Sequence, residues 1–358
     1  MTAAPYTHLL IETLREPRRA AGYSVGHWQA LIWQSRATEL MAQLHQALDA
    51  VGAMETAPPA ARRHLELAGK IATRHAAAVT SELRSLQEAL EPLGIPVLLL
   101  KGAAYCALGH QASKGRLFND LDIMVPKSAL AKSEQQLIWE GWLPLHTNAY
   151  DERYYRDWTH EIPPLEHKHR ATTLDVHHTI LPPTSGIRPN PQDFFDAARP
   201  LNGEFSFFKV LCPADMVIHS ACHLFFGEFH KGLRDLHDLN LLLSDFGQRA
   251  EFWDNLVDRA RYLQLSLPLL DALTQGRRLY GTQIPDNTLR QLKACKTSPF
   301  PGFMRAWLFE HALRPAHPSA FGTTTRLANK VAFARSHWLR MPLPLLVYHL
   351  SYKAFIAP

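Results

Sequence analysis

Four cysteines are all that the 358 residues contain, and none of them belongs to a CxxC pair. Their wide spacing is unlike that of a disulfide-stapled secreted domain and predicts a reducing, cytoplasmic location. The sequence has no run of about 18 apolar residues, so we expect no membrane-spanning helix. The first residues have no apolar segment of the signal-peptide kind, so we expect no secretory leader.

Several familiar catalytic motifs are also missing. The chain has no GxxxxGK[ST] phosphate loop, no GxGxxG dinucleotide fingerprint and no HExxH zinc motif. It has no GxSxG nucleophile elbow, so hydrolysis by an activated serine has no support. The net charge of +5 fits phosphate-bearing partners, but it is far below that of a dedicated nucleic-acid binder.

The chain divides into three regions by its hydrophobic pattern. A content of 46% hydrophobic and 20% charged residues is typical of a globular protein, and the length allows a core with large helical additions. Helical periodicity dominates residues 1–92, strand patterns lie in residues 93–182, and helical periodicity returns in residues 183–358, mainly from residue 213. We therefore predict an α+β fold, in which a small mixed-sheet core is flanked by N-terminal helices and a helical C-terminal domain.

The most informative stretch is residues 96–126. An apolar strand is predicted at 97–100, a turn and a short helix follow, and a second strand is predicted at 120–125. Asp120 and Asp122 are two positions apart on that second strand, so their side chains point to the same side. Two carboxylates so placed repel each other unless a cation lies between them.

A third carboxylate is predicted on a later strand. Residues 160–167 and 173–180 read as two strands joined by a polar turn, with Pro163 and Pro164 placing the first at an edge or on a bulge. In the second strand Asp175 and His177 alternate with apolar residues and share the polar face. The region between 143 and 182 is therefore expected to be rich in β-structure.

Together these carboxylates suggest metal-dependent phosphoryl chemistry. Two-metal sites hold their ions about 3.5–4 Å apart, and neighbouring strands lie about 4.8 Å apart. Asp120 and Asp122 on one strand with Asp175 on the next match that spacing, and Mg²⁺ prefers such oxygen ligands. We take the three as candidate catalytic and metal-binding residues. A solvated strand edge is the alternative for Asp120 and Asp122.

Basic residues near the turn are candidates for binding phosphate. Gly102 lets the backbone approach a phosphate group, and Lys101 adds a point charge. Lys114, Arg116 and Arg170 can hold a triphosphate tail, and Arg116 is preferred because it lies four residues before Asp120. An ordinary strand-to-helix turn and a solvated surface are the respective alternatives.

Two further groups lie in the helical C-terminal region. His219 and His223 are at i and i+4 with Cys222 between them, a spacing that suits zinc but lacks a third ligand, so helix packing or lining of a cleft is preferred. Arg234 and Asp238 are also at i and i+4, which favours a helical ion pair. Asp238 or Lys231 can alternatively contact a nucleotide base or ribose.

The combination of Lys101-Gly102-Ala103, Arg116, Asp120-Leu121-Asp122 and Leu174-Asp175-Val176-His177 resembles the bacterial family of uncharacterised nucleotidyltransferases. This family belongs to the DNA polymerase β-like nucleotidyltransferase superfamily, whose signature is a glycine-containing turn, a D-x-[DE] strand and a later single carboxylate. Here Ala103 replaces the usual second glycine or serine of the turn.

The resemblance implies an activity and a set of partners. It implies two Mg²⁺ ions and an NTP, with NMP passed to an acceptor hydroxyl that Asp175 readies as a base or metal ligand. A peptide or protein acceptor is favoured over nucleic acid. Two alternatives stay open: a non-catalytic nucleotide-binding or adaptor protein, and a phosphotransferase variant of the same fold.

Overall fold

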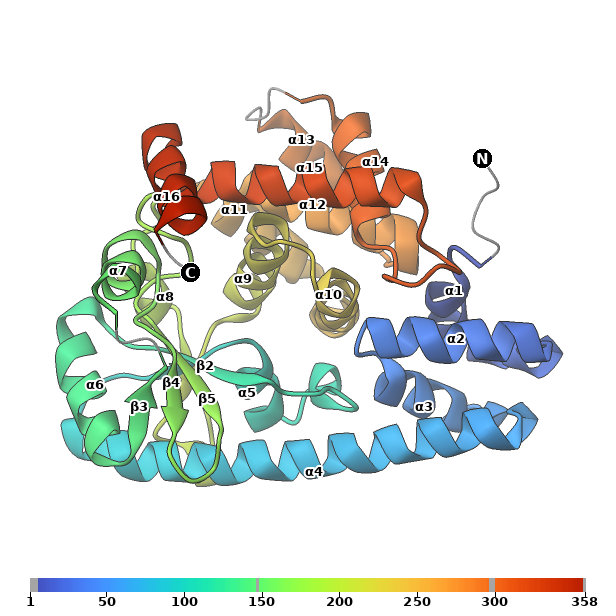
Figure 1. The fold of residues 1–358 in the computed structure, drawn as a ribbon, viewed down its shortest axis with the longest axis horizontal. Helices are drawn as coiled ribbons and strands as arrows, with labels where there is room; N and C mark the ends of the chain where they lie inside the picture. Colours follow the sequence, from blue (N-terminus) through green and yellow to red (C-terminus); the bar gives the residue numbers. More distant parts are fainter. Residues whose placement is uncertain (1–5, 146–147, 296–299, 357–358) are drawn as a thin grey trace.

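A mixed β-sheet forms the centre of the computed structural model, which describes residues 6–145, 148–295 and 300–356 (Figure 1). Residues 1–5 of the predicted N-terminal helical region lie outside these ranges. Within them, the sheet has seven strands in the order β3-β4-β5-β2-β1-β7-β6. Their bounds are β1 Leu98–Leu99, β2 Asp120–Met124, β3 Trp142–Pro144, β4 Leu165–His167, β5 Thr173–His177, β6 Arg199–Pro200 and β7 Lys209–Val210. The predicted α+β class is confirmed.

The helices around this sheet come from chain segments before, between and after its strands. The earlier ones are α1 Leu9–Arg15, α2 Val25–Ala37, α3 Met41–Asp49, α4 Pro59–Leu90, α5 Lys101–Ala107, α6 Leu130–Trp139 and α7 Ala149–Arg153. The later ones are α8 Gln192–Asp196, α9 Pro213–Phe226, α10 Gly232–Phe246, α11 Ala250–Tyr262, α12 Ser266–Gln275, α13 Asp286–Ala294, α14 Gly302–Ala312, α15 Thr323–Arg340 and α16 Leu343–Phe355. No helix among the described residues has the length and apolar character needed to cross a membrane.

Helix α4 connects the N-terminal helices to the core. Its 32 residues span about 48 Å at 1.5 Å per residue, and it runs along the whole lower edge of the molecule in Figure 1. Proline at its first position lacks the N–H that would be unpaired there, which favours helix initiation. Leu65, Leu83 and Leu86 are fully buried on its inner face, which packs on α3 near one end and on α5 and α6 near the other.

The prediction of a β-rich segment from 143 to 182 is wrong for its first half. In place of a strand, this part of the chain forms helix α7 and a following π-helical turn, Tyr154–Trp158. The Asn148 side chain accepts a hydrogen bond from the Asp151 backbone N–H and so caps α7. Tyr150 in this helix stacks on Tyr352 of α16 at a centroid distance of 3.6 Å, so tertiary packing with the C-terminal helix overrides the local β-propensity.

The predicted strand 160–167 is present but interrupted at Pro163 and Pro164. On one side of the prolines, Leu165 of β4 pairs with Leu174 of β5; on the other side, Glu161 forms an isolated antiparallel bridge with His177. The four-residue distance from Glu161 to Leu165 is therefore matched by only three residues, Leu174 to His177, on the other strand. One extra residue on one strand of a pair defines a β-bulge. The prolines, which cannot donate ladder hydrogen bonds, lie within it, so the bulge expected from the sequence is confirmed.

The sheet also includes residues beyond position 182. Strand β7 pairs in parallel with β1, with Leu98 opposite Lys209, and β6 pairs with β7 at the edge. The predicted helical pattern from residue 213 onward is confirmed by α9 to α16. Figure 1 shows these helices above the sheet, with α9 and α10 nearest to β2.

Candidate active site

The register between β2 and β5 brings three carboxylates to one face of the sheet. The two strands are parallel, and Asp122 is the Cα partner of Asp175. Directly paired residues point to the same side, and neighbouring strands lie about 4.8 Å apart. Asp120, two residues before Asp122, shares that side. The geometry expected from the sequence for these three residues is thus present in the fold.

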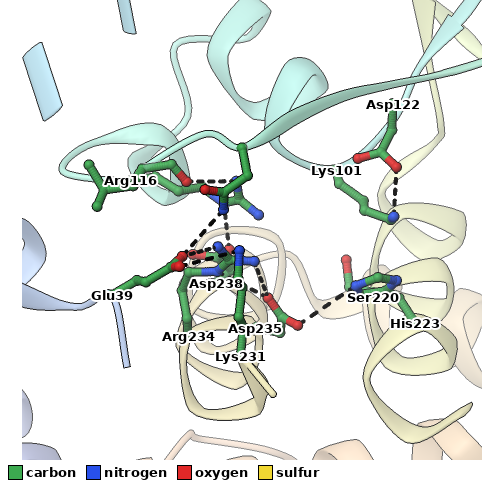
Figure 2. A network of polar contacts seen from close by, with 12 residues as sticks. Glu39, Lys101, Arg116, Asp122, Ser220, His223, Lys231, Arg234, Asp235 and Asp238 are labelled. Carbon is green, nitrogen blue, oxygen red and sulfur yellow. Dashed lines mark hydrogen bonds and ion pairs between the residues drawn. The ribbon is translucent and has the colours of Figure 1, made fainter. Parts of the chain in front are cut away.

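The side chain of Asp122 is buried, and it accepts hydrogen bonds from two other side chains. The Lys101 Nζ lies 2.7 Å from Asp122 Oδ1, as Figure 2 shows, and His177 Nε2 lies 3.0 Å from the same oxygen. Burial favours the neutral acid, but Lys101 and His177 outweigh it and hold the pKa of Asp122 well below its usual range. Burial opposes the charged form of Lys101 as well, yet Asp122 raises the pKa of that ammonium, so the pair is ionised.

Asp175 has a different environment, although it lies beside Asp122. Its Oδ1 is buried and has no hydrogen-bond partner among the described residues. Burial, followed by Glu161 and Asp122, raises the pKa of Asp175 well above its usual range. An orphaned carboxylate oxygen next to other carboxylates fits a divalent cation, because the cation supplies the missing charge. The donor set of Asp120, Asp122 and Asp175 therefore fits Mg²⁺.

Glu161 is a fourth carboxylate at this face, and it was not among the residues predicted from the sequence. As the bridge partner of His177, it lies on the same side of the sheet as His177 and Asp175. Without the bulge, the register of β4 would place Ile162 opposite His177 instead, because a one-residue slip exchanges the two faces. The signal in the sequence was the Pro163-Pro164 pair, which marks the bulge. Because of the bulge, the side chains of Glu161 and Leu165 point to opposite faces of the sheet, whereas in a regular strand residues four apart share a face.

Gly102 and Arg116 contact each other closely beside the carboxylates. A Cβ on Gly102 would lie 2.7 Å from Arg116 Nη1 and 3.0 Å from Phe118 Cδ1, so a side chain there would collide with both. Arg116 is buried, and its Nε donates to Asp238 Oδ2 at 2.8 Å. Arg116 and Asp238, which we assigned separately to the nucleotide, are thus bound to each other. Gly102 is required at least in part by this packing.

A second polar network links three distant segments at the rim (Figure 2). Glu39, which follows α2, accepts from Arg234 Nη1 at 2.6 Å and lies 3.2 Å from Lys231 Nζ. Arg234 also binds Asp235, so the helical pair predicted between Arg234 and Asp238 is not formed; each has another partner. Asp235 lies 3.7 Å from His223 Nε2.

Lys231, Arg234, Asp235 and His223 of this network line a cavity of about 300 Å³, the lower end of the range typical for small-ligand sites. Its lining residues are Lys101, Arg116, Asp120, Asp122, His223, Leu224, Gly227, Glu228, Phe229, His230, Lys231, Arg234, Asp235 and Arg340. Five of them are lysine or arginine and four are aspartate or glutamate, so cationic and carboxylate side chains line the cavity together.

Other predicted residues lie away from the cavity lining. Lys114 is exposed, Ala103 is buried in α5, and Asp238 lies behind Arg116. Arg170 pairs with Glu82 of α4 and so has a structural partner. In contrast, Arg340 from α15 lies at the cavity and binds Glu228. It lies more than 160 residues from Asp175, and local patterns could not reveal the contact.

The zinc alternative for α9 is not supported in the described part of the chain. His219 and Cys222 are buried in the helix, and His223 lies at the cavity beside Asp235. Among the described residues, the cluster whose potential ligand atoms all lie within 4.8 Å of one another is instead His160, Glu161 and His177. Asp120, Asp122 and Asp175 share a face of the sheet without forming so tight a cluster. The preferred expectation, packing for His219 and lining of the cleft for His223, is consistent with this arrangement.

Residues 24–281, well over half of the chain, match the family described as uncharacterised nucleotidyltransferase, and the chain belongs to that family. The match includes Glu39, the carboxylates and α10, but not Arg340. Searches of curated proteins and of solved structures found no match.

Proposed function

We propose that this chain is a Mg²⁺-dependent nucleotidyltransferase that moves NMP from an NTP to an acceptor hydroxyl. The observation that carries the proposal is the pairing of Asp122 with Asp175 across parallel strands, with Asp120 on the same face. Family membership supports the same reaction class. A cytoplasmic location is part of the proposal, because ATP and the other NTPs are found there.

The carboxylates would hold the metal, and the cationic side chains of the cavity would hold the triphosphate. Asp120 and Asp122 lie at the cavity and Asp175 beside them, so these three would provide the Mg²⁺ ligands. Bound Mg²⁺ would neutralise phosphate charge and stabilise the attacking and leaving oxygens. Lys231, Arg234 and Arg340 border the same cavity and would orient the phosphates of the NTP.

Asp175 is the best placed residue to receive a proton from the acceptor. Its Oδ1 has no partner in the described structure, whereas Asp122 is committed to Lys101 and His177. The net charge of +5 is small for a nucleic-acid binder, which favours a peptide or protein hydroxyl as acceptor.

The test is transfer of a label from the α-phosphate. Each of the four NTPs, labelled at that position, is incubated with Mg²⁺, the protein and a library of peptides containing Ser, Thr and Tyr. We expect one labelled product whose mass increases by a nucleotide, and a loss of at least about 100-fold with Asp122→Asn. Asp258→Asn is the matched control, because Asp258 is exposed and on α11.

Two outcomes would select the alternatives. Nucleotide binding by calorimetry without transfer from any NTP to the peptides or to the chain itself favours the adaptor function. A product heavier by one phosphate, labelled only from the γ-position, favours the phosphotransferase variant.

A further inference from the structure

The side chains of His160, Glu161 and His177 converge next to the carboxylate face, the side of the sheet that bears Asp120, Asp122 and Asp175. Each offers a ligand atom, and these atoms lie within 4.8 Å of one another. His177 Nδ1 is 3.5 Å from Glu161 Oε2, and His160 Nε2 is 3.9 Å from the same oxygen. The bulge at Pro163 and Pro164 produces this convergence, since it places Glu161 opposite His177.

Hydrogen bonding fixes which atom of His177 faces Glu161. In the neutral His177 ring the proton lies on Nε2, which donates to the Asp122 carboxylate at 3.0 Å. Nδ1 then carries a lone pair, is buried, and has no hydrogen-bond partner in the described chain. It lies 3.5 Å from the Glu161 Oε2 carboxylate oxygen. A metal cation between these two atoms would bind both.

We propose that His160, Glu161 and His177 form a site for a divalent transition metal such as Zn²⁺, separate from the Mg²⁺ ligands. Two imidazoles and one carboxylate are a donor set that suits zinc and related metals, whereas Mg²⁺ prefers oxygen ligands alone. The side chain of His177 is only 1% exposed, while His160 and Glu161 are 25% and 20% exposed. The site is therefore built on a buried ligand and open to solvent on the other side.

The distances need only a small adjustment to bind such an ion. Donor atoms about 2.0–2.1 Å from zinc in a tetrahedron lie roughly 3.3 Å from one another. The separations of 3.5 and 3.9 Å exceed this by about 0.2 and 0.6 Å, and rotation of the partly exposed side chains of His160 and Glu161 could close those gaps. A water molecule would complete the coordination.

Asp122 would couple this site to the carboxylate face. A metal-binding histidine commonly donates its other ring N–H to a carboxylate, which fixes its tautomer and orientation. His177 does so to Asp122, so the same carboxylate would orient one metal ligand and bind the Mg²⁺ of the reaction. Occupancy by a transition metal would thereby fix the position of Asp122.

Cobalt(II) provides a spectroscopic probe for the site. The metal-free full chain is titrated with Co²⁺ in the presence of excess Mg²⁺, which saturates the carboxylate ligands. We expect one equivalent of Co²⁺ with visible absorption typical of nitrogen and oxygen ligation. We expect its affinity to fall more than about 10-fold with His160→Ala or Glu161→Gln. His169→Ala is the matched control, because His169 is exposed in the turn after β4.

The readout needs no nucleotidyl transfer, so its failure and that of the proposed function can be distinguished. Equal Co²⁺ affinity in His160→Ala, Glu161→Gln and the control would overturn the site, as would the absence of a saturable equivalent in the unchanged protein. If a variant fails to fold, anomalous scattering from crystals of the unchanged protein soaked with Zn²⁺ decides the question. Density between Glu161 and His177 supports the site, and density only elsewhere, for example at His223, refutes it.

Discussion

Asp122 and Asp175 lie directly opposite each other on parallel strands, yet their electrostatic environments are opposite. Asp122 is bound by Lys101 and His177, which hold its pKa low. Asp175 is buried, has an unpartnered oxygen and faces Glu161 and Asp122, which raise its pKa. The negative charge of Asp122 is thus balanced by protein side chains, whereas Asp175 is available to bind a metal ion or a proton.

Asp175→Asn should separate stability from activity. The change removes a carboxylate that burial and its neighbours disfavour, so the metal-free protein should gain roughly 1 kcal/mol in unfolding free energy. Nucleotidyl transfer should fall at least about 100-fold, because a proposed metal ligand is lost. Thermal unfolding in a chelator and the α-phosphate label measure the two effects. The control is Asp215→Asn, which weakens a buried pair with Arg259 and should lose stability. A destabilised Asp175→Asn would contradict this view.

Gly102→Ala should destabilise the turn through a steric collision. The new Cβ would lie within 3.0 Å of Arg116 and Phe118, and such overpacking typically costs about 1–3 kcal/mol. Denaturant unfolding measures the loss. Gly302→Ala is the control, because a Cβ there meets nothing within 4 Å and α14 should tolerate or prefer alanine. Equal stability of both variants would show that Gly102 is not needed for packing.

Asp238→Ala should lower stability and leave NTP binding at the proposed site largely unchanged. Removing Asp238 leaves Arg116 buried without its ion-pair partner, a change that typically costs about 3–5 kcal/mol. The double variant Arg116→Met with Asp238→Leu should recover much of that loss, as measured by denaturant unfolding. If Asp238 instead contacts the base or ribose, Asp238→Ala would weaken NTP binding without this loss of stability, and calorimetry would reveal it.

His237 should make the fold sensitive to mild acid. Burial lowers its pKa to about 4 from about 6.5, so the unfolded chain binds a proton before the folded protein does. Stability is therefore lost as the pH falls from 6.5 to 4, by up to about 3 kcal/mol, and is not lost further below that. His237→Leu should show a shallower decline over this range in chemical unfolding at several pH values. A parallel decline would mean that His237 has an ordinary pKa.

The sequence predicted those parts of the site that depend on local alternation. Asp120, Asp122 and Asp175 lie on predicted strands. The period of two residues placed Asp120 and Asp122 on one side of their strand and Asp175 on the polar side of its own. Glu161 escaped because alternation fails at a bulge, where one extra residue exchanges the two faces. Arg340 and Glu39 escaped for another reason: their contacts bring together segments far apart in the chain, and no local period describes such packing. The helix at 149–158 was missed because its aromatic side chains bind α16.

Lys101 has a backbone φ of 42°, in the left-handed region that side chains disfavour and glycine accepts freely. A substitution to glycine would therefore relieve conformational strain, usually about 1 kcal/mol or more for a residue held in this region. Lysine at this position strains the turn, but its loss would leave Asp122 buried without its ion-pair partner, a change that typically costs about 3–5 kcal/mol. The ion pair therefore outweighs the strain, and selection for thermostability would be expected to keep lysine at position 101 for as long as Asp122 is kept.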